Sequence, residues 1–360
     1  MRIAISTGGG DAPGLNAVIR GAVLSALNRG WTVYGIRRGF GGLLGTDGVI
    51  QLDADSVRGI THLGGTILGT TNRGDPFCWP EQQADGTVVE HDRSDELLAA
   101  FRAHGLEALI TIGGDGSLRI AQRLHAKGLP VVGVPKTIDN DVAGTVMTFG
   151  FDTAVSTATD ALDKLHSTAE SHERVMVVEL MGRYAGHIAL TAGISGSADV
   201  ILIPEIPYDI EKVCAKVRER EARGRKFSIV VVAEGAIAQG GKRTIKGAAE
   251  KGGAMERLGG VAEQVAKEIG RRTGKETRSL VLGHLQRGGT PTTFDRLLSL
   301  RFGAAAVRCV AEKTFGVMVA LHPPSIVPVP FTKALGEPRL VPLDSDTIQT
   351  ARDIGVCLGD

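Results

Sequence analysis

The sequence predicts an α/β fold of two lobes, with mostly parallel sheets flanked by helices. Strand-like runs alternate with helix-like runs through most of the chain, which is typical of parallel sheets covered by helices. Two glycine clusters each follow a predicted strand and precede a predicted helix, where open α/β sheets bind ligands. With 360 residues, the chain is long enough for two compact lobes.

The predicted elements follow in order along the chain. Short β-branched and apolar runs indicate strands at 3–6, 32–36, 108–112, 130–134, 175–180, 200–203, 229–233 and 280–283. Longer stretches that are apolar on one side indicate helices at 15–28, 94–104, 118–127 and 151–170. Two regions interrupt this alternation. Residues 73–92 are expected to form a surface excursion, and residues 235–260, rich in glycine and lysine, an exposed insertion.

Composition narrows the class of protein. The 41 Lys and Arg residues nearly balance the 40 Asp and Glu residues, so no nucleic-acid partner is expected. No apolar stretch reaches the roughly 18 residues of a membrane span, so no membrane partner is expected either. We interpret the cysteines as reduced thiols of a cytoplasmic protein, because neither metal-ligand nor redox-pair spacing relates Cys78, Cys214, Cys309 and Cys357.

The most informative stretch follows the predicted strand at 130–134. Lys136, Thr137, Asp139 and Asp141 come just after this buried strand, where open α/β sheets carry their chemistry. If the chain stays extended, the hydroxyl and both carboxylates share one face beside the lysine ammonium. A phosphate-transfer enzyme needs such groups as base, metal anchor and neutralising charge.

Two glycine clusters are candidate phosphate-binding loops. The first, at 7–14, opens a predicted helix, so its N–H groups suit an anion; a plain strand-to-helix turn is the alternative. It lacks the Lys-Ser/Thr of a Walker loop. The second, at 112–117, contains Asp115, which can hold Mg²⁺ directly or through water; capping the helix is the alternative. Its Gly-Gly-Asp-Gly core indicates a phosphoryl donor.

Six motifs then occur in order: Gly-Gly-Asp-Ala-Pro-Gly at 9–14, Gly-Gly-Asp-Gly-Ser at 113–117, Thr-Ile-Asp-Asn-Asp at 137–141, Met-Gly-Arg at 181–183, Pro-Glu at 204–205 and Gly-His-Leu-Gln-Arg-Gly-Gly at 283–289. On these motifs the chain resembles the 6-phosphofructokinases along almost its whole length. The resemblance implies two Rossmann-like lobes with the active site in the cleft between them. The phosphoryl-donor lobe would comprise residues 1–150 and 286–336, and the sugar-phosphate lobe residues 151–285 and 337–360.

The activity implied by the resemblance is transfer of the ATP γ-phosphoryl group to the 1-hydroxyl of fructose 6-phosphate. This glycolytic step yields fructose 1,6-bisphosphate and ADP, with Mg²⁺ as cofactor. Asp139 would accept the hydroxyl proton, with Thr137 and Arg183 as further catalytic residues. A homotetramer is implied, with a dimer as the minimum active unit, because Arg174 and Arg278 would complete a neighbouring subunit's site.

The other matched residues divide between donor and sugar. Asp115 would hold the metal, and the donor would be bound by Gly10, Arg73, Gly74, Gly114, Asp115, Gly116 and Ser117. The sugar phosphate would be bound by Thr137, Ile138, Asp139, Met181, Gly182, Arg183, Glu234, His284, Leu285, Gln286 and Arg287. By chemistry alone, His284 could be a structural histidine, Glu234 a solvated acid and Met181 a core residue.

The donor motif combines two patterns. Pyrophosphate-using relatives usually carry Asp where this chain has Gly116, and Lys where it has Lys136. An Asp side chain would crowd the α-phosphate of a nucleotide, so we weigh Gly116 more heavily and favour ATP. Pyrophosphate as donor and sedoheptulose 7-phosphate as acceptor are the alternatives. A non-catalytic relative is the alternative of another class, and it would be expected to lose Asp139 or Asp115.

Overall fold

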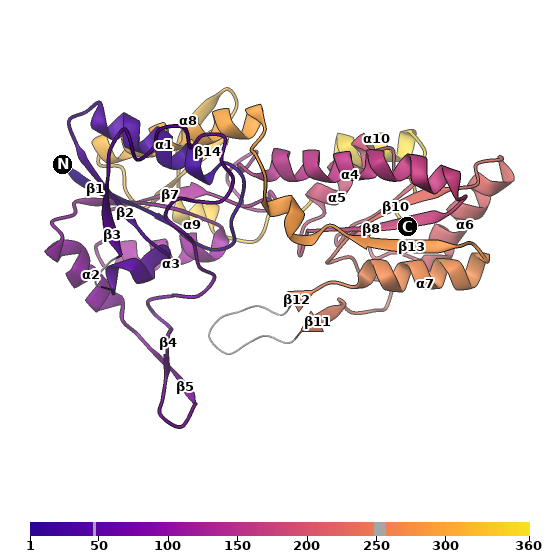
Figure 1. Cartoon of the computed structure of the whole chain (residues 1–360), viewed down its shortest axis with the longest axis horizontal. Coiled ribbons are helices and arrows are strands. Elements are labelled where there is room, and N and C mark those ends of the chain that lie inside the picture. Colours follow the sequence, from indigo (N-terminus) through magenta and orange to yellow (C-terminus); the bar gives the residue numbers. More distant parts are fainter. Residues whose placement is uncertain (46–47, 248–256) are drawn as a thin grey trace.

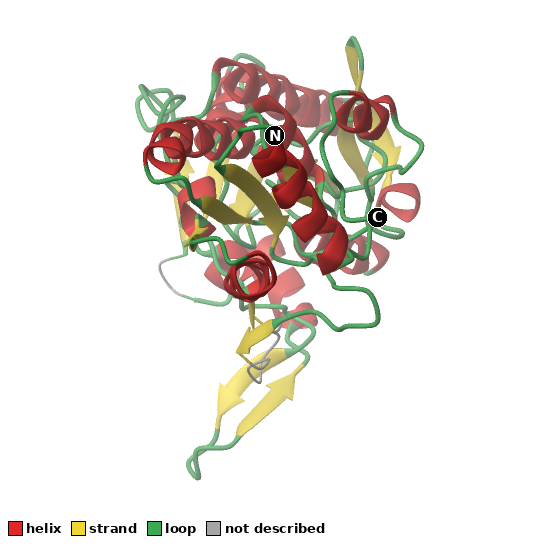
Figure 2. Cartoon of the chain, turned by 90° about the vertical axis from the view of Figure 1, so that its right-hand side faces the viewer, coloured by secondary structure: helices red, strands yellow, loops and turns green. Residues whose placement is uncertain are grey.

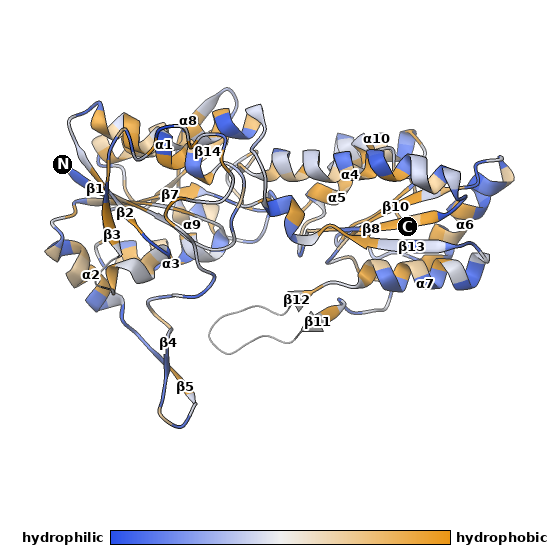
Figure 3. Ribbon diagram, viewed as in Figure 1, coloured by the Kyte–Doolittle hydropathy of each residue, from blue (hydrophilic) through white to orange (hydrophobic). Residues whose placement is uncertain are grey.

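Two α/β lobes lie side by side in the computed structural model, which describes residues 1–45, 48–247 and 257–360 (Figure 1). The N-terminus lies in the first lobe and the C-terminus in the second (Figure 1). In both lobes, apolar strands lie next to helices whose outer faces are polar (Figure 3). The predicted α/β class is therefore confirmed. Among the described residues, no helix is both long and apolar enough to span a membrane.

The first lobe is built on a seven-stranded sheet in the order β15-β14-β7-β6-β1-β2-β3. Its strands are β1 (Arg2–Thr7), β2 (Thr32–Ile36), β3 (Val49–Leu52), β6 (Ala108–Gly113), β7 (Val131–Pro135), β14 (Val317–His322) and β15 (Ser325–Pro330). The five inner strands run parallel, and the edge strands β3 and β15 are antiparallel to them. One face packs on α1 (Leu15–Leu27) and α8 (Thr293–Ala311), and the other on α2 (Ser94–Ala103), α3 (Asp115–Ala126) and α9 (Phe331–Ala334).

The second lobe has a four-stranded sheet in the order β13-β8-β10-β9. Its strands, β8 (Val175–Leu180), β9 (Val200–Leu202), β10 (Ser228–Ala233) and β13 (Thr277–Val281), are all parallel. One face packs on α4 (Phe151–Ser171), α5 (His187–Ser195) and α10 (Asp346–Asp353), and the other on α6 (Ile210–Ala222) and α7 (Val261–Thr273). Short 3₁₀ helices follow β2 and β13: η1 (Gly39–Leu43) and η2 (Gly283–Arg287).

Two smaller strand pairs lie outside the main sheets. β4 (Trp79–Gln82) and β5 (Val88–His91) form a hairpin in the region predicted to be a surface excursion. This hairpin projects from the first lobe (Figures 1 and 2). β11 (Ile245–Gly247) pairs with β12 (Arg257–Leu258) within the predicted insertion, and the residues between these strands lie outside the described part of the chain.

The chain passes to the second lobe before α4, returns before α8 and leaves the first lobe again after α9.

Buried polar side chains connect the first turns of α4 and α8. Asp295 Oδ2 accepts hydrogen bonds from Thr153 N at 2.8 Å and Thr153 Oγ1 at 2.5 Å. Thr292 Oγ1 donates to Asp152 Oδ2 at 2.5 Å. Each helix thus satisfies N-terminal groups of the other, which fixes how the lobes meet.

Several predicted elements differ in extent from those observed. The strand predicted at 280–283 lies at Thr277–Val281, because Gly283 already begins η2. The helix predicted from residue 118 begins at Asp115, directly after β6. Two further elements of the first lobe, α8 and β14, are absent from the predicted set. The division into a donor lobe and a sugar lobe stays a prediction.

Candidate active site

The candidate site lies where the carboxyl ends of parallel strands from the two lobes approach each other. In the first lobe, β1 and β7 lead into residues 8–14 and 136–141. In the second, β8 and β13 lead into residues 181–183 and η2. Arg287, the last residue of η2, donates from Nη1 to the carbonyl oxygen of Asp11 at 3.1 Å. This hydrogen bond joins the two strand-end regions.

The segment after β7 forms a tight turn. Thr137 Oγ1 accepts a hydrogen bond from Asp139 N at 3.1 Å and donates to Asp141 Oδ1 at 3.1 Å. Asn140 has a left-handed backbone, with φ of 54°. The chain is not extended here, because the threonine hydroxyl bonds the backbone two residues on and so favours a turn. The turn still gathers the hydroxyl and both carboxylates.

Asp139 is the group best suited to accept a proton. Its Oδ1 is buried and has no hydrogen-bond partner among the described residues. Burial, and then the Asp141 carboxylate, raise the pKa of Asp139 to about 7, while the Arg287 cation opposes the rise. A carboxylate with a free oxygen and a pKa near neutrality matches the requirements of a general base.

Lys136 lies under the first glycine loop. Its side chain is buried, with 3% exposed, and Nζ donates to the carbonyl oxygen of Gly10. Burial, and then the Arg287 cation, lower the pKa of Lys136 to about 8. The ammonium thus neutralises the turn carboxylates and also fixes the loop that precedes α1.

Gly10 lies close to the Arg287 side chain across the site. A Cβ atom at this position would lie only 2.8 Å from Nη1 of Arg287. The loop is also bonded to the segment that contains Thr70 and Thr71. Gly9 N donates to Thr71 O at 3.0 Å, and Thr70 Oγ1 donates to Gly9 O at 2.5 Å. The glycine loop therefore contacts three separate segments of the chain.

The second glycine motif forms the start of α3. Gly114 is the N-cap and Asp115 the first helical residue, so the alternative that Asp115 caps the helix is wrong. Its half-exposed carboxylate accepts from Arg119 Nε at 2.7 Å. Asp115 also raises the pKa of Asp141, although burial is the largest cause. A Cβ atom on Gly116 would meet nothing within 4 Å, so the helix start beside the motif is open.

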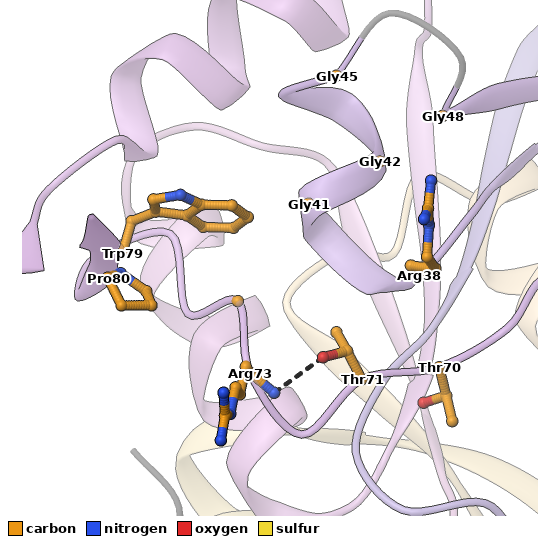
Figure 4. A pocket seen from close by; sticks show the side chains of 11 residues that line it. Arg38, Gly41, Gly42, Gly45, Gly48, Thr70, Thr71, Arg73, Trp79 and Pro80 are labelled. Atoms are coloured by element: carbon orange, nitrogen blue, oxygen red, sulfur yellow. Dashed lines mark hydrogen bonds between the residues drawn. The ribbon is translucent and has the colours of Figure 1, made fainter. Parts of the chain in front are cut away.

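A pocket of about 560 Å³ opens beside the first glycine loop (Figure 4). It contains the predicted donor residues Arg73 and Gly74. Sequence reasoning missed its other walls: Arg38, Gly41, Gly42, Gly45, Gly48, Thr70, Thr71, Trp79 and Pro80. The glycine-rich run after β2 was the available signal for one wall. Trp79 comes from the β4–β5 hairpin, and its indole ring faces the η1 glycines (Figure 4).

The opposite wall comes from the second lobe. Met181 N donates to Oε1 of the fully buried Gln286 at 3.4 Å, so the predicted Met-Gly-Arg turn contacts η2. Burial raises the pKa of Glu234, and the Arg183 and Arg287 cations oppose this, which indicates that both guanidinium groups lie near its carboxylate. His284 and Leu285 are exposed. Two cations and an acid can hold a phosphorylated sugar.

Arg174 and Arg278 lie elsewhere. Arg174 directly precedes β8 and its guanidinium contacts Glu276 at 2.9 Å, and Arg278 contacts the same carboxylate at 2.5 Å. Both therefore lie at the amino end of the sheet. Six strand residues, roughly 20 Å, separate this end from the Met181 turn. Neither arginine joins the other site residues within one subunit.

Comparisons with known proteins agree with this geometry. The family model described as phosphofructokinase matches residues 2–310. The chain belongs to the phosphofructokinase family. It is 53% identical to an ATP-dependent 6-phosphofructokinase of Chloroflexus aggregans, over all of this chain and 98% of that protein. It is 50% identical to ATP-dependent 6-phosphofructokinase 1 of Synechocystis, with the same coverage. The predicted phosphotransferase is thereby confirmed.

Solved structures give the same family. Pichia pastoris phosphofructokinase in the T-state aligns with a TM-score of 0.79 at 30% identity, over 98% of this chain. This phosphofructokinase spans only 36% of that longer chain. A pyrophosphate-dependent phosphofructokinase from Nitrosospira multiformis aligns with a TM-score of 0.80 over the whole chain and 92% of its own, at 21% identity. That likeness supports the fold alone.

The pKa of Asp139 leads to a testable pH dependence. A base is active only when deprotonated, so the rate of phosphoryl transfer should fall as the pH drops through about 7. In an Asp141→Asn variant the neighbouring negative charge is absent, so the pKa of Asp139 should decrease and the acid limb should move to lower pH. Rate profiles of both enzymes between pH 5 and 9 measure this. Titration of the substrates affects the wild-type and Asp141→Asn profiles equally. Identical acid limbs in the two profiles would therefore contradict the effect of Asp141 on the pKa of Asp139.

Proposed function

We propose that this phosphofructokinase transfers the γ-phosphoryl group of ATP to the 1-hydroxyl of fructose 6-phosphate. The single observation that carries the proposal is Asp139: a carboxylate with one buried, unpartnered oxygen, which feels the Arg287 and Lys136 cations and has a pKa raised to about 7. The relatives' names, ATP-dependent 6-phosphofructokinase, support the choice of substrates. All residues that a non-catalytic relative would be expected to lose are present.

In the proposed mechanism, the 1-hydroxyl oxygen attacks the γ-phosphorus, the bond from that phosphorus to the β-bridging oxygen breaks, and the hydroxyl proton passes to Asp139. Arg183 and Arg287 would hold the 6-phosphate, and Glu234 would accept from sugar hydroxyls. The glycine loop and the N-terminus of α3 would supply backbone N–H groups to the donor phosphates. Positioning and charge neutralisation would lower the barrier, as in other phosphoryl transfers.

The proposed cofactor is Mg²⁺, held at Asp115 with the donor phosphates. Within the described residues, no group of three or more His, Cys, Asp or Glu side chains could hold a metal by themselves. This agrees with Mg²⁺, which usually takes one or two carboxylates and completes its coordination with phosphate oxygens and water. The half-exposed Asp115 carboxylate, electrostatically coupled to Asp141, meets that requirement. The ion would neutralise charge on the donor phosphates.

ATP is the proposed donor rather than pyrophosphate. The pocket of about 560 Å³ beside the glycine loop, with an indole wall and two arginines, offers room and contacts for a nucleoside. The open space at Gly116 leaves the start of α3 accessible to a nucleotide's α-phosphate. Lys136, the residue typical of pyrophosphate enzymes, is already bonded to the Gly10 carbonyl.

The proposed assembly is a homotetramer with a dimer as the minimum active unit. The distant position of Arg174 and Arg278 supports a site completed by a neighbour, because neither can serve its own subunit's site. Arg174 Nε is buried without a hydrogen-bond partner among the described residues. The edge strand β13 is also exposed, with Val281 50% accessible, and such an edge suits a partner chain.

We also propose a cytoplasmic location, which the four unpaired cysteines support.

One crossed assay tests the function. The enzyme is given ATP or pyrophosphate with either fructose 6-phosphate or sedoheptulose 7-phosphate, and each bisphosphate product is measured. We expect the highest kcat/KM with ATP and fructose 6-phosphate. An Asp139→Ser variant should lose kcat by at least about 100-fold, the low end for a lost general base, with little change in the sugar KM. A preference for pyrophosphate, or near-normal kcat in the variant, would overturn the assignment.

The donor preference depends on Gly116. A Cβ atom at this position meets nothing within 4 Å, and an acidic residue is favourable in the first turn of a helix, so we expect the Gly116→Asp variant to fold. The new carboxylate would repel the α-phosphate by about 4 kcal/mol at 4 Å and intermediate dielectric, before screening. Even a third of this is about tenfold in kcat/KM for ATP. Gly116→Asn adds the same bulk without charge and should cost less; equal losses would show that charge is not the cause.

The shared site can be tested by mixing inactive subunits. Arg174→Ala and Asp139→Ala chains, unfolded together and refolded, should regain roughly a quarter of wild-type activity. Half of random dimers are hybrids, and each hybrid contains one intact site. A mixture of Asp139→Ala with Asp115→Ala is the matched control, because both residues serve the same subunit's site, and it should stay inactive. No recovery in the first mixture would refute the sharing.

A further inference from the structure

A segment near the C-terminus, residues 336–341, crosses the catalytic turn after α9. We call it the C-terminal strap. Arg339 N donates to Asp141 O at 2.8 Å. The Arg339 guanidinium donates to the carbonyl oxygen of Asn140 from Nε at 3.1 Å and from Nη2 at 2.9 Å. One residue thus bonds the backbone at two successive positions of the turn that carries Asp139.

The strap is anchored in both lobes. On the first, Arg119 Nη2 donates to Gly336 O at 2.8 Å, and the same guanidinium bonds the Asp115 carboxylate. On the second, Val341 N donates to Glu205 Oε1 at 2.8 Å. His187 Nε2 lies 3.1 Å from Arg339 O. Arg339 is therefore held at the turn by contacts on both of its sides.

The backbone of the turn sets where the Asp139 side chain lies. Its Oδ1 lacks a hydrogen-bond partner among the described residues, so the position of the carboxylate depends on the backbone of the turn. That backbone is left-handed at Asn140, a conformation that asparagine adopts more readily than most residues with a side chain. Contacts from three residues hold the turn: Thr148 N donates to Asn140 Oδ1 at 3.0 Å, Thr137 Oγ1 bonds Asp139 N and the Asp141 carboxylate, and Arg339 donates to the carbonyl oxygen of Asn140.

We propose that Arg339 is a positioning residue for the catalytic base: it fixes the turn so that the Asp139 carboxylate points at the sugar hydroxyl, and it touches no substrate. This inference rests on the proposed function of Asp139. Neither the motifs nor the family resemblance assigned a role to Arg339, which is 199 residues from its partner Asn140. Loss of its guanidinium leaves the turn carbonyl unpaired and frees the turn to relax.

The experiment compares Arg339→Ala and Arg339→Lys with wild type. Arg339→Ala should lower kcat by about 10- to 100-fold, the scale of a misplaced catalytic group, while both substrate KM values stay within about threefold. Arg339→Lys retains a cationic donor and should recover part of kcat. Added guanidinium chloride at millimolar concentration should also restore part of the Arg339→Ala rate. A general loss of structure would produce neither the kcat-against-KM split nor the rescue.

Arg20→Ala is the matched control, because Arg20 also donates to a loop carbonyl, Val57 O at 2.6 Å, but lies in α1. It should leave kcat within about threefold. If Arg339→Ala does not fold, Arg339→Gln, which keeps a neutral donor, takes its place. Wild-type kcat in the Arg339 variants, equal losses at Arg20, or losses that guanidinium and lysine fail to rescue would overturn the proposal. An inactive wild type would instead overturn the proposed function.

Discussion

The structure depends on how charge is buried at the carboxyl end of β7. Lys136 is almost fully buried and Asp139 and Asp141 are half-buried, yet the two carboxylates do not pair directly with the ammonium. Desolvation of this kind is costly, and proteins tolerate it where the shifted pKa values are useful. The compensation comes from outside the strand: a carbonyl of the glycine loop takes the ammonium, and Arg287 reaches across from the other lobe. Groups from both lobes therefore contribute to the charge balance of this cluster.

The relation of the two sheets explains why one chain can gather these groups. Parallel strands direct all their carboxyl ends to one edge, and loops at that edge are free to carry polar residues. In the proposed function, one of these two edges binds the donor and the other the acceptor. The hydrogen bonds of Asp295 join α4 to α8 and so help to fix how the two edges are placed relative to each other. The Asp295 carboxylate is buried, and desolvation is the chief cause that raises its pKa to about 6.

Sequence patterns predicted the parts of the site that lie close in the chain to a strand. The glycine loop, the start of α3 and the polar residues after β7 each lie within a few residues of the strand that positions them, so strand prediction found them. The turn at Asn140 was missed because the competing side-chain hydrogen bond of Thr137 outweighed extension. Trp79 and Arg339 were missed for a different reason. Their relevance comes from tertiary contacts with η1 and Asn140, across long stretches of chain, and no periodicity records such contacts.

The position of β14 has a consequence for the order in which the protein is made. β14 pairs with β7 inside the first sheet, although the whole second lobe, apart from its C-terminal segment, lies between them in the chain. During synthesis from the N-terminus, β7 must therefore wait with an unpaired apolar edge until residue 322 has emerged. Unpaired edges invite strand addition by other chains. The strand that leads into the turn at Asp139 thus keeps one edge unpaired while the second lobe is being made, and that edge is open to strand addition in a nascent chain.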